Sequence, residues 1–454
     1  MDLLIKNGII VNADQEIAAD IHIRNGLIHK IKKDIRLDKG DSAEVIDAYR
    51  TFVMPGGIDP HVHMHLPGIT GHSSDDFVSG SRAALLGGTT TIIDFVTPER
   101  GESIRDALLA RMDEAFDCNT DYSFHISPVE WNDFTARHIE DCINKGFTSF
   151  KIYMAYKNSI GLEDDAIEKV MEVVAGMGGL VCMHCETEGE IEQLRRDFAD
   201  SGKLSPISHA LSRPPHTESA AVKRAIELAE KTSCPLYIVH VSTAESVNLI
   251  KKAHKRGLKI MAEVCPHHLL LDISLYDSVF EKAASYVLSP PLRSAEHREA
   301  LWRGIQDGAI ESVATDHCPF FMSQKMNGIA DFRKIPMGAG GVEHRLQLLY
   351  TFGVLKGLLG IRDFVGVCSA NPASIFGLYP RKGVIREGSD ADVIIWDPSA
   401  ENRITARKHH QNSDINIYEG MKTRGQARTV ILGGQVVARD GKLTGTSRGQ
   451  LLRR

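Results

Sequence analysis

The sequence predicts an α/β protein: a (β/α)8 barrel with a small β-sandwich domain built from both ends of the chain. Two observations predict this fold. Between residues 55 and 373, short apolar strands alternate with amphipathic helical segments, and eight strand-helix units fill that length. Residues 1–54 and 374–440 instead contain short strands separated by turns, and residues 441–454 follow as a C-terminal tail. A chain of 454 residues is long enough for both parts.

The two terminal segments have the same β-rich character. Residues 3–11 and 20–31 are rich in apolar and β-branched residues, and Asn25-Gly26 supplies the positive φ angles of a tight hairpin turn. Residues 390–397 and 428–443 repeat this pattern near the other end. Because each segment is too small to bury a good core alone, we expect the two to pair in one composite domain.

The central segment contains the eight candidate strands of the barrel. They cover residues 56–63, 89–95, 121–127, 148–154, 179–186, 235–241, 258–267 and 311–317. Segments between the strands space their apolar residues three and four positions apart, as helices do. Examples are residues 102–117, 163–178 and 218–231. A doubly wound open sheet is the competing fold, but the glycine-rich run at 337–341 has neither the spacing nor the position of its phosphate turn, so we interpret that run as a loop. The basic residues 446–454 are predicted to be mobile.

Composition excludes several classes of function. The formal net charge is −6 and the pI is about 6.4, so no overall basic field would attract nucleic acid. No apolar run reaches the roughly 18 residues of a membrane span, and the N-terminus lacks a basic region, an apolar stretch and a cleavage site. The eight cysteines lie mostly in apolar segments, and we interpret Cys182 and Cys185 as buried strand residues and not as a zinc pair. We therefore expect a cytoplasmic protein.

Polar residues stand near the carboxyl ends of the predicted strands, which is where barrel enzymes place their chemistry. Each is a metal ligand or can become one. They are His61, His63, Lys151, His184, His240 and Asp316.

Each of these residues alone has an ordinary structural explanation: a histidine satisfied by its neighbours, a helix cap, or a lysine stem lying along the core. Their common placement argues for a site. His61 and His63 lie on one face of a strand, because side chains alternate with period two. Imidazoles combined with a carboxylate suit zinc, iron, manganese or nickel better than calcium or magnesium.

Lys151 requires a separate explanation, because an ammonium group would be repelled by two metal ions. Its surroundings, TSFKIYMAY, are apolar and favour the neutral amine. A neutral amine reacts with carbon dioxide to give a carbamate, which is an anionic group that can bridge two metals. Two such metals about 3.5 to 4 Å apart can share a water and lower its pKa toward neutrality.

The chain resembles a known family. The motifs that carry the resemblance are DPHVHMH, AALLGGTTTIIDF, SFKIYMAYK, HCETEGE, RPPHTES, IVHVSTAESV, SPPLR, ATDHCPF, ANPASIFGLYPRKGVIREGSDADVIIWDP and HHQNSDINIYEGM. Together they resemble the dihydropyrimidinase and hydantoinase branch of the metal-dependent cyclic amidohydrolases, within the amidohydrolase superfamily of TIM barrels. The resemblance extends over nearly the whole chain, including both terminal segments.

This resemblance implies a hydrolase of C–N bonds in cyclic amides, which opens a dihydropyrimidine or a 5-substituted hydantoin to an N-carbamoyl amino acid. It implies two divalent metal ions per subunit, Zn2+ first and Mn2+ as the alternative. By resemblance, one ion is held by His61, His63 and Asp316, the other by His184 and His240, and carboxylated Lys151 bridges them.

The resemblance also implies how the reaction proceeds. A metal-bridging hydroxide attacks the ring amide carbon, and Asp316 takes its proton and returns it to the leaving ring nitrogen. The hydroxyl of Tyr156 holds the oxyanion together with a metal. Ser289 and Met337 fall where the family binds the amide and ureide edge of the ring, largely with backbone groups; hydantoinases usually have asparagine at the position of Met337.

The loop after His63 departs from the family. Relatives usually place an acidic residue and then bulky apolar residues there, in contact with the ring substituent. This chain has His65 and Leu66 at the corresponding place, and Gly68 removes bulk. We therefore expect a roomier or differently shaped substituent pocket.

Two alternatives remain. A dihydroorotase or allantoinase is suggested by HVHMHLPG and EVCPHHLLLD, but dihydroorotases need a cation for the substrate carboxylate, typically an arginine where this chain has His65. The second is a non-enzymatic scaffold like the collapsin-response mediator proteins, which have lost metal ligands. By resemblance we expect a homotetramer, or at least a dimer, in which residues 409–421 contact neighbouring subunits. The expected partner is a small cyclic ureide or imide substrate, and we expect neither nucleic acid nor a membrane as a partner.

Overall fold

The computed structural model describes residues 2–37, 42–445 and 447–454. Met1, residues 38–41 and Thr446, which belong to the predicted terminal segments, lie outside the described residues. Eight parallel strands form one sheet in chain order, so the predicted (β/α)8 barrel is confirmed. The barrel strands are β8 (Gly57–Asp59), β11 (Thr89–Val96), β12 (Asp121–Ile126), β13 (Ser149–Tyr153), β14 (Leu180–His184), β15 (Leu236–Ile238), β16 (Ile260–Val264) and β17 (Ser312–Val313).

Side chains close the barrel between its first and last strands. Arg345 Nη1 donates to the carbonyls of Ile58 and Val313 at 2.7 and 2.8 Å, which joins β8 to β17. The buried carboxylate of Asp59 accepts from the backbone N–H and the hydroxyl of Thr315 at 3.1 and 2.6 Å. Buried polar groups therefore hold the first and last barrel strands, β8 and β17, together.

Helices cover the outside of the barrel. The α-helices are α1 (Phe77–Leu86), α2 (Ile104–Glu114), α3 (Thr135–Asn144), α4 (Asp164–Gly176), α5 (Glu188–Asp200), α6 (Ile207–Leu211), α7 (Pro215–Thr232), α8 (Ala244–Lys255), α9 (Pro266–Leu270), α10 (Phe280–Ser285), α11 (Ala295–Gln306), α12 (Met322–Lys325), α13 (Arg345–Leu349), α14 (Ile361–Val365) and α15 (Asn371–Ile375). Short 3-10 turns cover Ile273–Tyr276, Met326–Gly328 and Phe332–Lys334, and π-helical turns cover Tyr350–Val354 and Gly366–Ala370.

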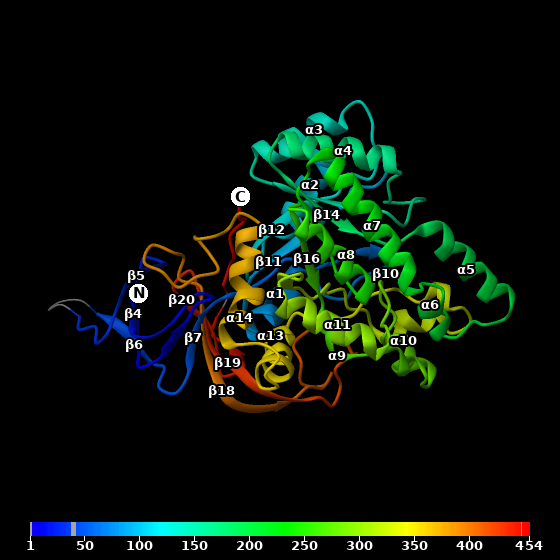
Figure 1. Ribbon diagram of the computed structural model, residues 1–454. Coiled ribbons are helices and arrows are strands. Elements are labelled where there is room, and N and C mark those ends of the chain that lie inside the picture. Colours follow the sequence, from blue (N-terminus) through cyan, green and yellow to red (C-terminus); the bar gives the residue numbers. More distant parts are fainter. Residues whose placement is uncertain (1, 38–41, 446) are drawn as a thin grey trace.

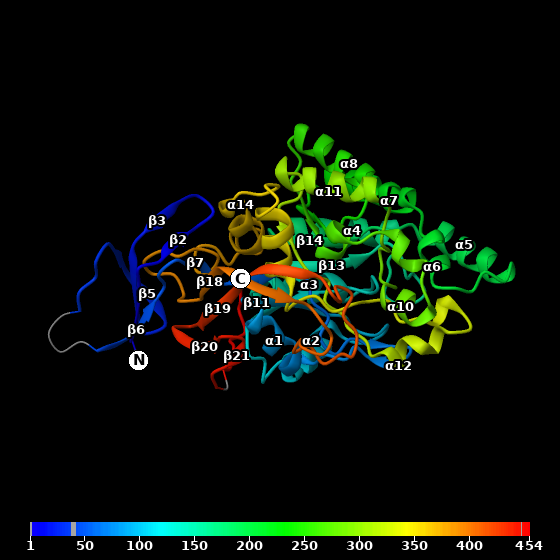
Figure 2. The same cartoon turned by 90° about the horizontal axis from the view of Figure 1, so that it is seen from below.

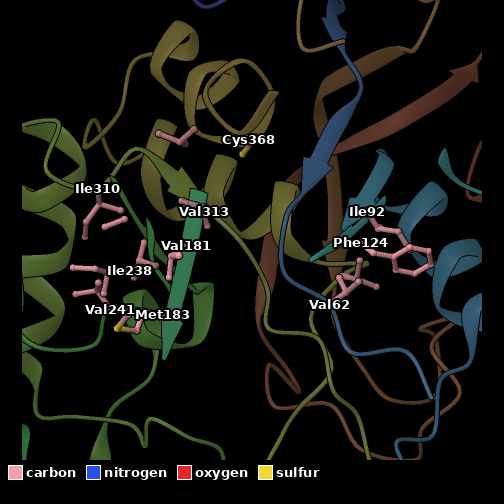
Figure 3. Close-up of a cluster of buried hydrophobic side chains, with 14 of the residues drawn as sticks. Val62, Ile92, Phe124, Val181, Met183, Ile238, Val241, Ile310, Val313 and Cys368 are labelled. Atoms are coloured by element: carbon pink, nitrogen blue, oxygen red, sulfur yellow. The ribbon is translucent and has the colours of Figure 1, made fainter. Parts of the chain in front are cut away.

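Alternation along the strands creates two cores. Val181 and Met183 of β14 point outward into the large core between strands and helices, with residues such as Ile238 and Val313 (Figure 3). Leu180 and Cys182 point the other way, into a smaller cluster with Tyr237 and Phe376 inside the barrel. His184 continues this inward series at the carboxyl end of β14.

The two ends of the chain form two further sheets beside the barrel, where the blue N-terminal and the orange and red C-terminal strands lie together (Figures 1 and 2). One sheet has the order β5-β4-β1-β6 and the other β21-β20-β19-β18-β7-β2-β3. Their bounds are β1 (Asp2–Lys6), β2 (Ile9–Val11), β3 (Glu16–Ala18), β4 (Asp20–Arg24), β5 (Leu27–Lys32), β6 (Ala43–Asp47), β7 (Phe52–Pro55), β18 (Val393–Arg403), β19 (Lys422–Leu432), β20 (Gln435–Arg439) and β21 (Lys442–Leu443).

Both ends contribute to one buried cluster, which includes Ile10 and Val53 from the N-terminal segment and Val393 and Ile431 from the C-terminal segment. The predicted pairing of the termini is thus confirmed. The Asn25-Gly26 turn also has the expected positive φ angles, 55° and 78°.

The C-terminal tail differs from the mobile segment that the sequence predicts. Leu452 is buried beside Ile58 and Leu378, and Leu451 forms a parallel bridge with Tyr122. The Arg454 guanidinium donates to Ser149 Oγ at 2.8 Å. The two leucines explain the difference, because they bury apolar surface at the amino end of the barrel despite the basic residues around them.

The described residues contain no helix that combines the length and apolar character of a membrane span. All eight cysteines are buried and none forms a disulfide.

Candidate active site

A cavity of about 810 Å³ opens at the carboxyl ends of the barrel strands. Every site residue that the sequence predicts lines it. These are His61, His63, His65, Leu66, Lys151, Tyr156, His184, His240, Ser289, Asp316 and Met337.

Strand geometry explains why distant residues meet in this cavity. Lys151 of β13 is in register with Cys182 of β14, two residues before His184, so the inward faces of the two strands bring the lysine and the histidine together. His61 and His63 follow β8, where Val62 bridges to His317 beyond β17. The His-x-His pair therefore faces the segment that contains Asp316.

His240 and Asp316 lie just past their strands, and not within them as the predicted strand bounds imply. Strand β15 ends at Ile238 and β17 at Val313. His240 and Asp316 have φ angles of 38° and 50°, in the left-handed region that non-glycine residues seldom adopt. Such conformations concentrate at functional sites, where they re-aim a side chain.

The first cluster of donor atoms contains His61, His63 and Asp316. The Nε2 atoms of the two imidazoles lie 3.2 Å apart, and Asp316 Oδ1 lies 3.2 Å from His61 Nε2 and 3.1 Å from His63 Nε2. Three lone-pair donors at this mutual spacing match the edges of a coordination sphere with metal-nitrogen bonds of about 2.0 to 2.1 Å.

A second cluster contains the other two histidines. His184 Nδ1 lies 3.0 Å from His240 Nε2. One donor atom each of His61, His240 and Asp316 fall within 4.8 Å of one another, so the two clusters adjoin. The residues present thus fit two neighbouring divalent ions.

Lys151 lies among these groups, where burial opposes its charge more than the carboxylates of Asp316 and Glu263 favour it. It is 1% exposed, and its Nζ lies 5.1 and 5.0 Å from the ring centroids of Phe95 and Tyr153. Within the described part of the chain, no carboxylate forms an ion pair with it. Burial lowers the pKa of Lys151 below its ordinary value, which favours the neutral amine.

Burial also sets the charge of the histidines. It lowers the pKa values of His63 and His184, and it lowers that of His240 well below the ordinary range. These imidazoles are therefore neutral and available as ligands. Burial opposes ionisation of Asp316 too, but the adjoining His61 and His63 hold the pKa of that carboxyl well below its usual range.

Two buried glutamates orient the histidines, and the sequence analysis missed both. Glu263 Oε1 contacts His61 Nδ1, which leaves His61 Nε2 facing Asp316. Glu186 Oε2 accepts from His184 Nε2 at 3.0 Å, which leaves His184 Nδ1 facing His240. Carboxylate-histidine pairs of this kind fix the tautomer of metal ligands. The available signals were a carboxylate inside the apolar strand β16 and the Glu two residues after His184.

Tyr156 lies beside the second cluster, in the loop after β13. Its hydroxyl lies 2.8 Å from Ser289 Oγ, and its ring centroid lies 5.3 Å from that of His184. Burial raises the pKa of Tyr156, so the hydroxyl keeps its proton and can donate a hydrogen bond.

A buried arginine that the sequence analysis also missed connects these groups. Arg213 Nη1 donates to Glu186 Oε2 at 2.6 Å and to Ser289 Oγ at 3.0 Å, and its Nη2 lies 3.8 Å from Met337 Sδ. Arginine and glutamate thus hold Ser289 and Met337 beside the histidine cluster. The motif RPPHTES begins with this arginine, but the motif does not indicate which groups the guanidinium contacts.

Polar side chains lie at the mouth of the cavity. The rings of His65 and His72 stack with centroids 4.0 Å apart, and His65 Nδ1 lies 4.0 Å from Glu114 Oε1. His72 belongs to the short hairpin of β9 (Pro67–Gly68) and β10 (Gly71–His72). Leu66 contributes apolar surface next to this pair.

The segment around residues 409–421 folds back on its own chain. Asn416 Nδ2 lies 2.8 Å from His344 Nε2, and the Asn412 N–H donates to Asp75 Oδ1 at 2.9 Å. These contacts do not test the predicted role of the segment between subunits.

Comparison with known proteins agrees with this geometry. Residues 52–437 match the amidohydrolase family. The chain is 40% identical to the D-hydantoinase of Geobacillus stearothermophilus, over 98% of this chain and 94% of that protein. It is 39% identical to the dihydropyrimidinase of Arabidopsis thaliana, over 96% of this chain and 82% of that protein.

Solved structures resemble the whole chain. A crystal structure of D-hydantoinase superposes with a TM-score of 0.98 at 39% identity, covering 100% of this chain and 99% of the other. The L-hydantoinase of Arthrobacter aurescens superposes with a TM-score of 0.90 at 28% identity, covering all of both chains.

Proposed function

Because the chain belongs to the amidohydrolase family, we propose that it opens a 5-substituted hydantoin or a dihydropyrimidine to an N-carbamoyl amino acid. Hydrolysis of a cyclic amide is the activity that its hydantoinase and dihydropyrimidinase relatives support. The observation on which the proposal rests is the convergence of all the predicted ligand residues, Tyr156 and Ser289 in one cavity.

The proposed cofactor is a pair of divalent ions, Zn2+ first and Mn2+ as the alternative. His61, His63 and Asp316 would hold one ion, His184 and His240 the other, and carboxylated Lys151 would bridge them. When bound, the pair would supply an ionised water near neutrality and polarise the ring carbonyl. The unpaired, buried amine of Lys151 supports the carbamate, because carboxylation turns an uncompensated group into an anionic ligand.

The side chains of the protein would then perform the proton transfers and orient the ring. Asp316, whose Oδ1 faces two imidazoles, is placed to take the proton of the attacking water and return it to the leaving ring nitrogen. The Tyr156 hydroxyl donates to the ring oxygen as it becomes negative. Ser289, held by Arg213, and the backbone around Met337 bind the amide and ureide edge of the ring.

The polar mouth supports a role for His65 and Leu66 in contacting the ring substituent. A stacked pair of histidines beside Glu114 offers hydrogen-bonding groups to a polar substituent, whereas a purely apolar wall would exclude such a substituent. We infer that the protein accepts substituted hydantoins, including substituents with a polar end.

A panel of dihydrouracil, 5-substituted hydantoins, dihydroorotate and allantoin, compared by kcat/KM, tests the substrate. We expect the 5-substituted hydantoins to be hydrolysed fastest. Dihydrouracil turning over far faster than every substituted hydantoin would contradict the proposed pocket. Preference for dihydroorotate or allantoin would instead assign the chain to one of those activities.

Metal analysis of the purified protein separates an enzyme from a non-enzymatic scaffold. We expect about two ions per chain, as a binuclear site requires. Protein prepared with metal available that contains none would favour the scaffold.

We further propose a cytoplasmic homotetramer. Eight buried, reduced cysteines support a reducing compartment. The likeness to the hydantoinases suggests the tetramer, which sedimentation measurements would test against the 50.0 kDa mass of one chain.

A further inference from the structure

A second buried lysine lies behind the cavity. Lys325 ends α12, is 1% exposed, and donates from Nζ to three backbone carbonyls. The acceptors are Val287 O at 2.9 Å, Pro336 O at 2.7 Å and Gly338 O at 2.8 Å. An ammonium group has three N–H donors and no acceptor, so these carbonyls match its capacity fully.

The three carbonyls belong to two segments that border the cavity. Val287 lies two residues before Ser289, and Pro336 and Gly338 flank Met337; Ser289, Met337 and Gly338 all line the cavity. The Gly338 N–H also donates to Val287 O at 3.0 Å, so the segments touch directly as well. Lys325 therefore connects the two backbone segments that, in the proposed function, bind the edge of the substrate ring.

Filling of apolar space alone does not explain a lysine here. Among the described residues no carboxylate pairs with Lys325, and a buried, unneutralised cation is costly. The titratable group that faces it is the Cys318 thiol, whose pKa is raised by burial, so the thiol stays neutral. A methionine of similar length would fill the space without that cost, but it would leave the carbonyls of Pro336 and Gly338 without a donor and that of Val287 with one donor fewer.

We propose that Lys325 is a positioning residue, which holds the Ser289 and Met337 segments at the spacing that the substrate ring requires. This inference rests on the proposed function, because it assumes that these segments bind the ring. It assigns Lys325 no contact with the substrate and no chemical step.

Burial also makes the connection sensitive to pH. It lowers the pKa of Lys325 to about 7, so the ammonium gives way to the neutral amine as pH rises through neutrality. The neutral amine has two donors for three carbonyls. The hydrogen bonding of Lys325 to the two segments should therefore weaken over the same pH range.

The test is the Lys325→Met variant, assayed with the best substrate of the panel. We expect kcat/KM to fall by about 10²-fold, mostly through a higher KM, because small misplacements of binding groups have costs of this size. The ratio of variant to wild-type KM should shrink between about pH 6 and about pH 8, as the wild-type lysine loses its third donor. Metal content should not change.

Lys382→Met is the matched control. Lys382 is also a buried lysine with three oxygen partners, but it lies near the amino end of the barrel, away from the cavity. This control should lower stability without raising KM. Unchanged KM in Lys325→Met, or an equal rise in Lys382→Met, would overturn the inference.

Hydrogen exchange gives a readout that needs no activity. In Lys325→Met, amides of residues 286–289 and 335–339 should exchange faster while the rest of the barrel does not. If the variant fails to fold, the same amides in the unmodified protein should lose protection between about pH 6 and about pH 8, beyond the intrinsic change in exchange rate. Unchanged protection would overturn the positioning role, whereas altered exchange in a protein that hydrolyses no cyclic ureide would contradict only the proposed function.

Discussion

The two ends of the barrel surround a buried lysine with different kinds of side chain. At the carboxyl end, Lys151 is surrounded by aromatic rings and forms no ion pair within the described residues. At the amino end, Lys382 lies 2.6, 3.1 and 2.5 Å from carboxylate oxygens of Asp121, Asp390 and Asp392. Both side chains are almost fully buried, at 1% and 3% exposure.

The pKa directions follow these surroundings. Burial opposes the charged form of both lysines, and for Lys151 it lowers the pKa. Around Lys382 the three carboxylates outweigh burial and raise the pKa. Removing one partner from a buried group of charges destabilises the fold, whereas a buried amine that forms no ion pair is a candidate for a functional site.

The largest expected effect comes from Lys151→Ala, which removes the proposed bridge. Metal content should fall below two ions per chain and hydrolysis should drop to background, because the bridging ligand orders both metals. Metal analysis and initial rates test this. A small carboxylate such as acetate should restore part of the activity. Activity that survives without such an addition would contradict the role of Lys151.

Lys382→Met should act on stability instead of chemistry. Removing the lysine leaves three carboxylates close together, so we expect a loss of about 3 to 5 kcal/mol in the free energy of unfolding. Urea titration measures this loss. kcat/KM should remain within about twofold of the unmodified protein, and a large kinetic defect would erase the contrast between the two barrel ends.

Tyr156→Phe should lower kcat by about 10²- to 10³-fold, which corresponds to about 2.7 to 4 kcal/mol of barrier, because the oxyanion loses a donor. Metal content and melting temperature should not change. Steady-state kinetics of the metal-loaded variant decide the matter. A variant that matches the unmodified enzyme would make Tyr156 a wall residue only.

Glu311, just before β17 at the amino end, gives the smallest effect and is an exception to the pairing seen at Lys382. Burial raises the pKa of Glu311 to about 7. Because the folded state holds this proton more tightly than the unfolded chain, stability should fall as pH rises from about 4.5 to about 7. Its side chain is 25% exposed, which reduces the effect to about 1 to 2 kcal/mol.

Glu311→Gln should remove that fall. Urea titrations of both proteins at about pH 5 and about pH 8 measure the difference. Identical pH dependence of the two proteins would show that Glu311 is adequately paired, for instance by His254 at 3.8 Å.

Much of the fold and the site was predictable because the signals are periodic. Apolar strands between amphipathic helices predict the barrel, and the alternation of side chains along β13 and β14 predicts which way Lys151 and His184 face. The predicted family is confirmed by the match of residues 52–437 to the amidohydrolase family and by the hydantoinase relatives. The left-handed conformations of His240 and Asp316 have no sequence signal, because histidine and aspartate adopt this region in only a minority of their occurrences.

The residues that the sequence analysis missed act through contacts between distant segments. Glu263 lies in the apolar strand β16 and Arg213 in the short loop between α6 and α7, and only the fold reveals that they face His61 and Ser289. Arg345, which joins the first and last barrel strands, is inconspicuous for the same reason. Contacts over such separations have no fixed spacing from which to predict them.

The strand pairing of Pro55 with Val393 determines when this protein can finish folding during its synthesis. Strand β7 emerges from the ribosome early but gains its neighbour β18 only after the whole barrel has been made. Until then, the N-terminal strands expose edges that can pair with other nascent chains. A truncated product would therefore retain an unpaired edge, and we expect it to aggregate even when its barrel is nearly complete.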